Sequence, residues 1–331
     1  MFTPRHGAVL LFAVLAVLPV VVDPYFMFVA NRLLIFVILA IGLNILIGFA
    51  GQFSFSHAAI FGIGAYGTGL LQVKLGLPYG IAAAGGVITA TLVGTLVALP
   101  ALRLSGLYLG LATLAFAMAV HWVFMNWNSV TFGAGGFRSP KLDASPLGLS
   151  PDSAIYYLCW IVAAVLVIAS VRVIRSRYGR SFIAIRDGEA AAQSLGINVL
   201  RAKLAAFAIS ALYAGTAGAL YAPLLGFVSP ESFDLFQMIL VLTMVIVGGL
   251  GSLAGTVMGV ITITCFIELL RDARAYQEIL LGAILVNFAV LRPEGLGMLL
   301  QRLPGWRERL SRGKVEPTAT ANPETRGHDA A

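Results

Sequence analysis

Residues 33–49 read LLIFVILAIGLNILIGF, a run without a single charged side chain. Similar apolar runs recur along the 331-residue chain and are separated by short polar or Gly-rich segments. Hydrophobic residues make up 59% of the chain and charged residues only 11%, whereas a soluble domain carries about 25% charged residues. So few charges cannot cover a soluble globule of this length. The sequence therefore predicts an integral membrane protein.

The apolar runs predict an all-α, polytopic transmembrane helical bundle. A span needs about 20 apolar residues, and fewer where a helix is short or broken. We expect about ten spans, with eight to ten allowed, at residues 8–22, 33–49, 57–72, 81–100, 104–125, 154–173, 204–222, 236–249, 253–270 and 277–291. The first run resembles a signal peptide but lacks a small-residue cleavage site, so we interpret it as a retained span. The Gly-rich turns 50–56 and 248–252 are compatible with a loop between spans or a break inside the membrane.

The basic residues predict the orientation, because cytoplasmic loops of membrane proteins are enriched in Lys and Arg. With ten spans and the N-terminus inside, 16 of the 22 Lys and Arg residues fall in cytoplasmic segments and six in outer segments. We therefore expect both termini inside. The transmembrane domain would occupy 1–303, with an outer loop at 126–153 and a cytoplasmic loop at 174–203. The basic segment 304–331 is predicted to be a disordered cytoplasmic tail.

The cytoplasmic loop 174–203 contains the sequence RYGRSFIAIRDGEAAAQSLGINVLRAK at 177–203. Asp187 is expected to cap a short helix whose first turn holds Glu189. Three alanines then favour helix, and Gly196 can end it in a left-handed conformation. A smooth alanine surface suits the close approach of another protein. An ordinary surface helix between two spans is the alternative interpretation.

Motifs along residues 30–300 resemble those of one bacterial family. They are LNILIGFAGQ at 43–52, Ser54, HAA at 57–59, GIGAY at 62–66, Ser105-Gly106 with Tyr108, ATL at 112–114, Gly179-Arg180, AIR at 184–186, EAA at 189–191, LGIN at 195–198, Lys203, Ala206-Phe207, Ser210-Ala211, Ala214-Gly215, GGLGS at 248–252 and PEGL at 293–296. In this order and spacing, the chain resembles the LivM-type permeases of branched-chain amino acid ABC importers. The EAA string resembles the coupling loop of ABC-importer permeases.

The resemblance implies a complete set of partners. A second homologous permease subunit, two cytoplasmic ATPase subunits and an extracytoplasmic solute-binding protein would assemble with this chain in the bacterial inner membrane, in contact with lipid and without nucleic acid. No cofactor is expected on this chain, because it lacks a GxxxxGK[ST] loop, so ATP would be used by the ATPases. The residues implied in ATPase coupling are Gly179, Arg180, Arg186, Glu189, Ala190, Ala191, Leu195 and Gly196.

Polar residues cluster around the first Gly-rich turn, although such groups are costly at membrane depth unless they are paired or face a cavity. We assign a possible pathway or gate to Asn44, Gln52, Ser54, Ser56, His57 and Thr113. Hydrogen bonding between helices is an equally good explanation. Thr113, His121 and Trp122 form a weaker second candidate. Glu268 is expected to pair with Arg271 or Arg274, or to reach water.

Two departures from the family pattern leave the solute open. Phe55-Ser56 precedes His57 where the family usually has Leu-Gly, and the outer loop reads TFGAGG at 131–136 where a Thr-Gly-Gly string is usual. Branched-chain amino acids are the first expectation, and urea, short amides or aromatic acids are alternatives.

An ion-coupled transporter is disfavoured because the spans offer almost no ionisable residue at mid-depth. No catalytic constellation or metal-binding cluster supports an enzyme.

Overall fold

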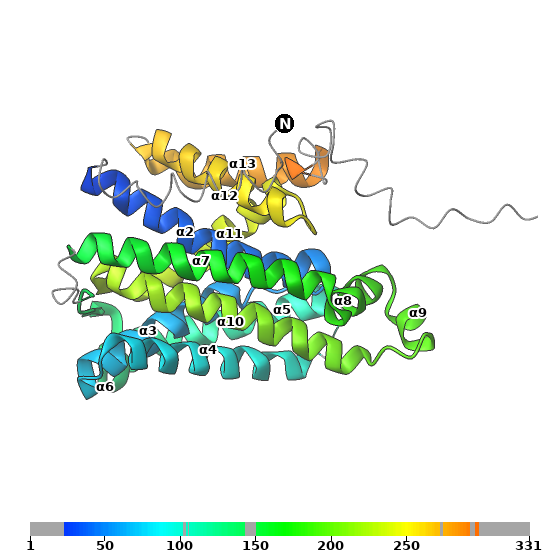
Figure 1. Ribbon diagram of the computed structural model, residues 1–331, viewed down its shortest axis with the longest axis horizontal. Helices are drawn as coiled ribbons and strands as arrows, with labels where there is room; N and C mark the ends of the chain where they lie inside the picture. The colour runs from blue at the N-terminus through cyan, green and yellow to red at the C-terminus, as the bar shows by residue number, and fades with distance from the viewer. Residues whose placement is uncertain are drawn as a thin grey trace, which may run out of the picture.

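The computed structural model describes residues 23–101, 104, 106–142, 150–271, 274–291 and 295–297. It is a bundle of long helices, several of which run side by side along the long axis of the molecule (Figure 1). The long helices are α2 (Pro24–Asn44), α3 (His57–Leu75), α4 (Tyr79–Ala101), α5 (Gly106–Asn126), α7 (Pro151–Arg175), α10 (Val199–Leu225), α11 (Leu235–Gly248), α12 (Leu253–Leu269) and α13 (Arg274–Leu291). The shorter elements are η1 (Ile45–Phe49), α6 (Asn128–Thr131), η2 (Gly133–Gly135), β1 (Phe137–Arg138), α8 (Arg177–Asp187), α9 (Glu189–Ser194), β2 (Phe227–Val228) and η4 (Pro230–Phe233).

Each predicted span from 33–49 onward coincides with a helix, so the all-α fold class is confirmed. In the described part of the chain, seven helices are long and apolar enough to cross a membrane, and two shorter apolar helices follow at 253–269 and 277–290. The predicted first span at 8–22 and the tail at 304–331 lie outside the described residues. The strands β1 and β2 are two residues each and pair antiparallel, with Phe137 opposite Val228.

Polar side chains mark the starts of several helices. Ser150, Ser176, Asn198, Asp234 and Ser252 each accept a hydrogen bond from a backbone N–H in the first turn of the helix that follows. These bonds satisfy amides that the helix itself leaves without a partner. The polar residues between the apolar runs therefore fix where the helices begin.

The chain reverses direction at both Gly-rich turns. Figure 1 shows α3 returning alongside the bundle after α2 has reached the end where α8 and α9 lie. At the second turn, Gly248 faces Gly255 and Met244 faces Gly259, which is the pattern of an antiparallel hairpin. Each turn is therefore a connection between two helices, and neither interrupts one continuing helix. Both lie at the end of the bundle that carries α8 and α9, here called the α8 end; the opposite end, with α6, is called the α6 end.

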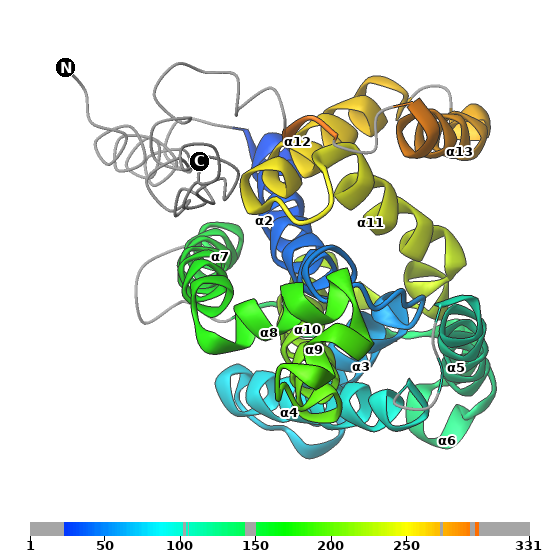
Figure 2. The ribbon, with the colours of Figure 1, turned by 90° about the vertical axis from the view of Figure 1, so that its right-hand side faces the viewer.

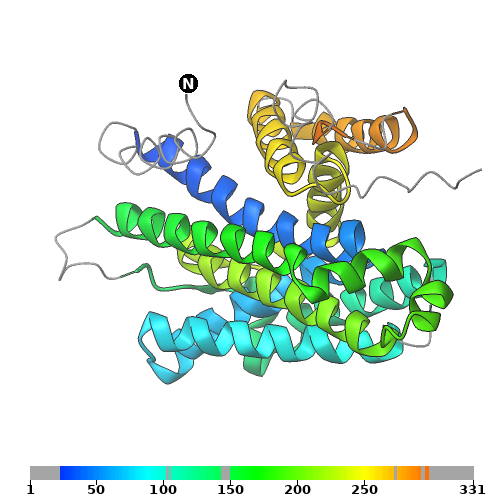
Figure 3. The ribbon, with the colours of Figure 1, turned by 45° about the vertical axis from the view of Figure 1, so that its right-hand side comes forward.

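Helices α2 and α10 occupy the middle of the bundle (Figure 2). The apolar segment made of α2 and η1 is more buried than any other long apolar helix of the described residues. Of its most apolar 18 residues, 83% are buried. Gly64 of α3 and Gly215 of α10 lie backbone to backbone, with no room for a Cβ on Gly64. Small residues allow such close helix packing in membranes. Helices α11, α12 and α13 form a group of their own beside α2 (Figure 3).

Candidate functional site

The predicted coupling loop folds into two helices, α8 and α9, which project from one end of the bundle (Figure 1). Gly196 adopts a positive φ of 81° directly after the last turn of α9, as predicted. The expected cap was wrong. Asp187 is the last residue of α8, and Gly188 stands at the start of α9 without any side-chain cap. The extended backbone at Gly188 separates α8 from α9. Asp187 therefore lies in the last turn of α8 and cannot cap the first turn of α9.

Helix α8 was not predicted as a separate element. Ser176 caps it, and Phe182 and Ile185 are buried three residues apart on one face. This spacing is a helical signal, hidden in the sequence by the many charged residues around it. Gly179 packs against the backbone of Ile174, and Arg180 is exposed at the surface.

Helix α9 is tied to the bundle by an ion pair. The Nζ atom of Lys203, on α10, lies 2.6 Å from Oε1 of Glu189. The Lys203 side chain is only 4% exposed, whereas that of Glu189 is 43% exposed. A buried ammonium without a counter-charge is costly, so Glu189 holds the first turn of α9 at a fixed place on α10.

The outer face of α9 is exposed and small. Ala190, Ala191 and Gly196 are exposed, whereas Ala192 is buried against the bundle. Leu195 is 79% exposed. The exposed leucine therefore lies beside a surface of small residues at this end of the bundle.

Arg186 joins the loop to the first Gly-rich turn. Its Nη1 atom donates a hydrogen bond of 2.9 Å to the carbonyl oxygen of Gly48, in η1. Element η1 is a π-helical turn that continues α2, and such turns are frequent at functional sites. Gly51 packs against the Arg186 side chain. A shift of α8 would therefore move the end of α2 through the Arg186–Gly48 hydrogen bond.

Asn44 joins the two Gly-rich turns to each other. Its Oδ1 atom accepts a hydrogen bond of 2.9 Å from the backbone N–H of Gly251, and its Nδ2 donates to the carbonyl oxygen of Ser252 at 3.2 Å and to Thr256 Oγ1 at 2.5 Å. Asn44 is completely buried. One amide side chain therefore holds the α11–α12 turn against α2.

The other polar residues of the first turn are also paired within the protein. Ser54 and Ser56 share a hydrogen bond of 2.9 Å between their hydroxyl groups. The Thr113 hydroxyl accepts a 3.0 Å hydrogen bond from the backbone N–H of Phe55, and Gln52 donates to the Ala50 carbonyl oxygen at 3.3 Å. These contacts shape the turn and attach it to α5. Their contribution to a pathway or gate stays a prediction.

His57 forms a bridge between helices. Its Nε2 atom donates to the Leu39 carbonyl oxygen of α2 at 2.9 Å, and its Nδ1 accepts from the Ser210 hydroxyl of α10 at 3.1 Å. The side chain is 1% exposed. Both ring nitrogens are thus used in packing three helices together.

A cavity of about 530 Å³ lies between α3, α5 and α11 and is here called the α5 cavity. Its walls are mostly apolar, with Met118, Trp122 and Met125 contributed by α5. His121 also lines it, and its Nδ1 atom has no hydrogen-bond partner among the described residues. The second candidate suggested by His121 and Trp122 thus faces a cavity, whereas Thr113 is bonded to the turn and does not line it.

The comparisons with known proteins place the chain in a family. The family model described as branched-chain amino acid transport system / permease component matches residues 25–289. The chain belongs to this permease family. The matched region runs from the first turn of α2 into the last turn of α13 and includes both Gly-rich turns, so the chain is a multi-pass membrane permease.

Two curated relatives carry names from one transport system. The chain is 34% identical over 293 residues to the high-affinity branched-chain amino acid transport system permease protein LivM of Escherichia coli (strain K12), covering 81% of this chain and 69% of the relative. It is 26% identical over 280 residues to the LivH permease protein of the same organism, covering 79% of this chain and 90% of the relative.

A more distant relative is named for a different solute. The autoinducer 2 import system permease protein LsrC of Klebsiella pneumoniae is 28% identical over 179 residues, about half of each chain. No solved structure matches the chain. Membership of the permease family therefore rests on the sequence match, and the arrangement of its helices on the structure described above.

Proposed function

We propose that the chain is the membrane-spanning subunit of an ATP-driven importer for branched-chain amino acids in the bacterial inner membrane. The observation that carries this proposal is the α8–α9 loop. It presents an exposed alanine surface to a partner, and Arg186 connects it to Gly48 at the end of α2. The family match and the LivM and LivH relatives support the same function.

The proposed orientation places the α8 end in the cytoplasm. The helices from α2 onward alternate in direction, so α2 would run from outside to inside and α13 would do the same. With the predicted span at 8–22, the count becomes ten, and both termini lie inside. The positively charged loop around Arg177 and Arg186 then faces the cytoplasm, in agreement with the positive-inside rule.

The proposed partners are two cytoplasmic ATPases, a second homologous permease and an extracytoplasmic solute-binding protein. The similarity to both LivM and LivH supports the second permease, because these two relatives are named as permease proteins of one system. ATP would be bound by the ATPases, and no cofactor is assigned to this chain.

The coupling would act through rigid contacts. The proposed ATPase surface consists of Gly179, Arg180, Arg186, Glu189, Ala190, Ala191, Leu195 and Gly196. ATP-driven closure would shift α9, and the Glu189–Lys203 pair would transmit the shift to α10. Arg186 would transmit it to Gly48, and Asn44 onward to the α11–α12 turn. The gate is proposed at this end, around Asn44, Gln52, Ser54, Ser56, His57 and Thr113.

The solute is proposed from the cavity walls. Three large apolar side chains of α5 face the α5 cavity, which suits the hydrocarbon side chain of a branched amino acid. Urea, short amides and aromatic acids stay as alternatives, since the binding protein would select the solute.

The test uses the chain reconstituted with its proposed partners in proteoliposomes, with ATP-dependent uptake of leucine and ATP hydrolysis as readouts. Leu195→Glu should lower both at least tenfold, because a buried carboxylate would oppose docking of the ATPase. Arg186→Ala should keep ATP hydrolysis and lose uptake, because α8 is no longer bonded to Gly48. Leu75→Glu is the matched control; Leu75 is 65% exposed at the α6 end, and its variant should transport normally.

Two results would contradict the proposal. Uptake that follows a proton gradient without any ATPase would identify an ion-coupled transporter. Normal uptake by both the Leu195→Glu and Arg186→Ala proteins would remove the α8–α9 loop from coupling.

A further inference from the structure

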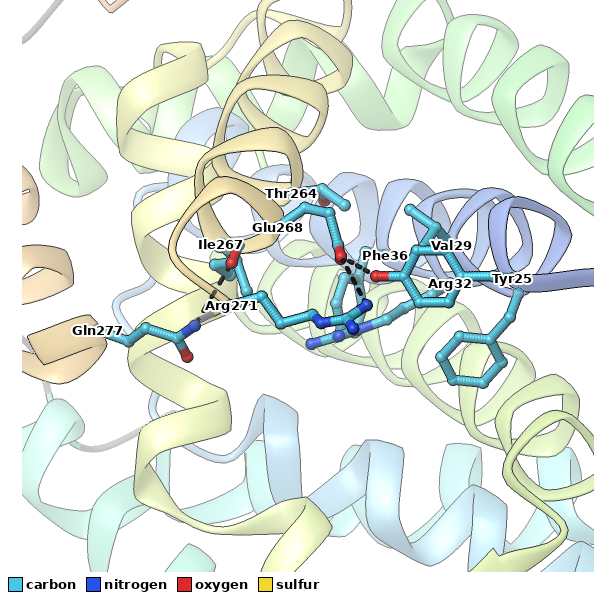
Figure 4. Close-up of a pocket in the computed structure, with 10 residues that line it drawn as sticks. Tyr25, Val29, Arg32, Phe36, Thr264, Ile267, Glu268, Arg271 and Gln277 are labelled. Atoms are coloured by element: carbon cyan, nitrogen blue, oxygen red, sulfur yellow. Dashed lines mark hydrogen bonds and ion pairs between the residues drawn. The ribbon is translucent and has the colours of Figure 1, made fainter. Parts of the chain in front are cut away.

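A second cavity, of about 450 Å³, opens at the α6 end between α2, α12 and the start of α13. It is here called the α2–α12 cavity. Three charged side chains line it: Arg32 from α2, Glu268 from the end of α12, and Arg271, which follows α12. Figure 4 shows all three pointing toward its centre. None of them belongs to the proposed coupling or gate residues.

The carboxylate of Glu268 is already well partnered. The Tyr25 hydroxyl donates a hydrogen bond to Oε1, and Arg271 Nη1 lies 3.7 Å from the same oxygen. The Arg271 guanidinium also lies over the Tyr25 ring, 4.9 Å from its centre. The expected pairing of Glu268 with Arg271 is thus confirmed. Through its hydrogen bond with Tyr25, Glu268 also links α12 to α2.

Among the described residues, Arg32 has no such carboxylate partner. Its guanidinium lies 5.2 Å from the centre of the Phe36 ring, and its Nε atom is buried without a hydrogen-bond partner among the described residues. Arginine keeps its proton in proteins. Two guanidinium groups and one carboxylate therefore line the cavity, and the described lining side chains carry a net charge of +1.

Long basic side chains near helix ends often extend toward water, which would explain Arg32 without any ligand. That explanation does not account for a second guanidinium, that of Arg271, which is turned into the same cavity. A planar guanidinium matches the two oxygens of a carboxylate or phosphate. The same cavity is walled by Phe28, Val29 and Ile267. The ligand that fits these features has an oxyanion next to an apolar part.

We propose that the α2–α12 cavity is a binding site for such an oxyanion, held by Arg32 and Arg271. Two sources supply this chemistry: the carboxylate of an apolar amino acid, and the phosphate of a membrane phospholipid. The amino-acid source rests on the function proposed above, and places a solute contact at the end where a binding protein would release it. The phospholipid source does not depend on that function.

The experiment uses the purified full-length chain without its partners. Binding of radiolabelled L-leucine is measured by scintillation proximity, and binding of added phosphatidylglycerol by native mass spectrometry. The chain should bind at least one probe. Arg32→Ala should weaken that binding about tenfold through loss of a charge-assisted hydrogen bond. Arg32→Lys should restore part of it, because a lysine supplies the charge without the planar fork.

Arg138→Ala is the matched control. Arg138 is exposed on β1, also at the α6 end but outside the cavity, and its loss should leave binding unchanged. Leucine binding that depends on Arg32 identifies a solute site, and phosphatidylglycerol binding that depends on Arg32 identifies a lipid site. If Arg32→Ala lowers the melting temperature, Arg271→Ala decides instead, because Arg271 is 54% exposed and its removal leaves the core intact.

The proposal is overturned if the chain binds neither probe, or if both arginine variants bind as well as the unaltered chain. These measurements involve neither ATP nor the α8–α9 loop. Their failure is therefore distinct from failure of the proposed transport function, which is tested by the Leu195 and Arg186 variants.

Discussion

Asn44 and Arg186 are single side chains that each connect segments far apart in the sequence. Asn44 uses both ends of its amide to hold the backbone of Gly251 and Ser252. Arg186 donates to the carbonyl oxygen of Gly48, which lies in η1, one helical turn after Asn44. In a membrane, a polar side chain is tolerated where its bonds are satisfied inside the protein. Asn44 and Arg186 both satisfy their hydrogen bonds by binding the backbone of a Gly-rich turn or of η1, which precedes one.

Replacing Asn44 with leucine should destabilise the protein by about 3 kcal/mol. The change keeps roughly the same size but removes the acceptor of the half-buried Gly251 N–H and the donor to Ser252 and Thr256. An unsatisfied buried group costs about 1–3 kcal/mol. Thermal unfolding of the detergent-purified chain should show a clear fall in Tm. Asn287→Leu is the control, since Asn287 is exposed on α13. Equal melting temperatures for the Asn44 variant and the unaltered chain would contradict the fastening role.

At the scale of elements, the α11–α12 hairpin depends on glycine at its contact face. Gly248 and Gly255 approach each other through their backbones, and Gly259 lies against the Met244 carbonyl oxygen. Small residues let two helices approach closely where lipid provides no hydrophobic force between them. The backbones of α11 and α12 therefore lie closer together than larger side chains at these positions would permit.

Gly259→Ala should push α11 and α12 apart and cost about 1–3 kcal/mol, the usual range for overpacking. Gly282→Ala is the matched substitution on α13, where no described atom lies within 4 Å of the added Cβ. It should be neutral or stabilising by up to about 1 kcal/mol, because alanine favours helix over glycine. The comparison is made by thermal unfolding of both variants, and an equal loss of stability in the two would mean that close packing is not the cause.

At the scale of the whole molecule, both Gly-rich turns and the α8–α9 loop gather at one end, and β1, β2 and α6 at the other (Figure 1). This separation gives the bundle two chemically different ends. The α8 end carries the basic loop, whereas the α6 end carries the α2–α12 cavity. The proposed orientation assigns the first to the cytoplasm.

Labelling with a membrane-impermeant thiol reagent should confirm that orientation. Ser194→Cys, on α9, should react only in inside-out vesicles, and Ser129→Cys, on α6, only in right-side-out vesicles. Both are made in a Cys265→Ser background, because Cys265 is an exposed free thiol and Cys159 is buried. Labelling of the two positions from the same side would rule out the proposed arrangement of spans.

The membrane fold and nine of the helices could be predicted from the sequence, because apolar length and composition determine which segments enter lipid. The short α9 helix and its end at Gly196 were also predictable, since alanine propensity and a left-handed glycine act locally. The Asp187 cap was wrong because the sequence does not show that α8 continues to that residue. Helix α8 itself had a local signal in Phe182 and Ile185.

Tertiary structure alone decided what the polar residues contact. The string around Asn44 and His57 is compatible with a pathway or with helix packing, and only the folded chain shows Asn44 on the Gly251 turn and His57 between Leu39 and Ser210. Their partners lie more than 150 positions away in most cases, beyond the reach of local propensity. The sequence determined which segments cross the membrane, because that depends on each segment's own transfer into lipid. The structure decided that Arg271 pairs with Glu268, and that Arg32 faces a cavity without an ion pair in the described part of the chain, because pairing depends on distances between helices.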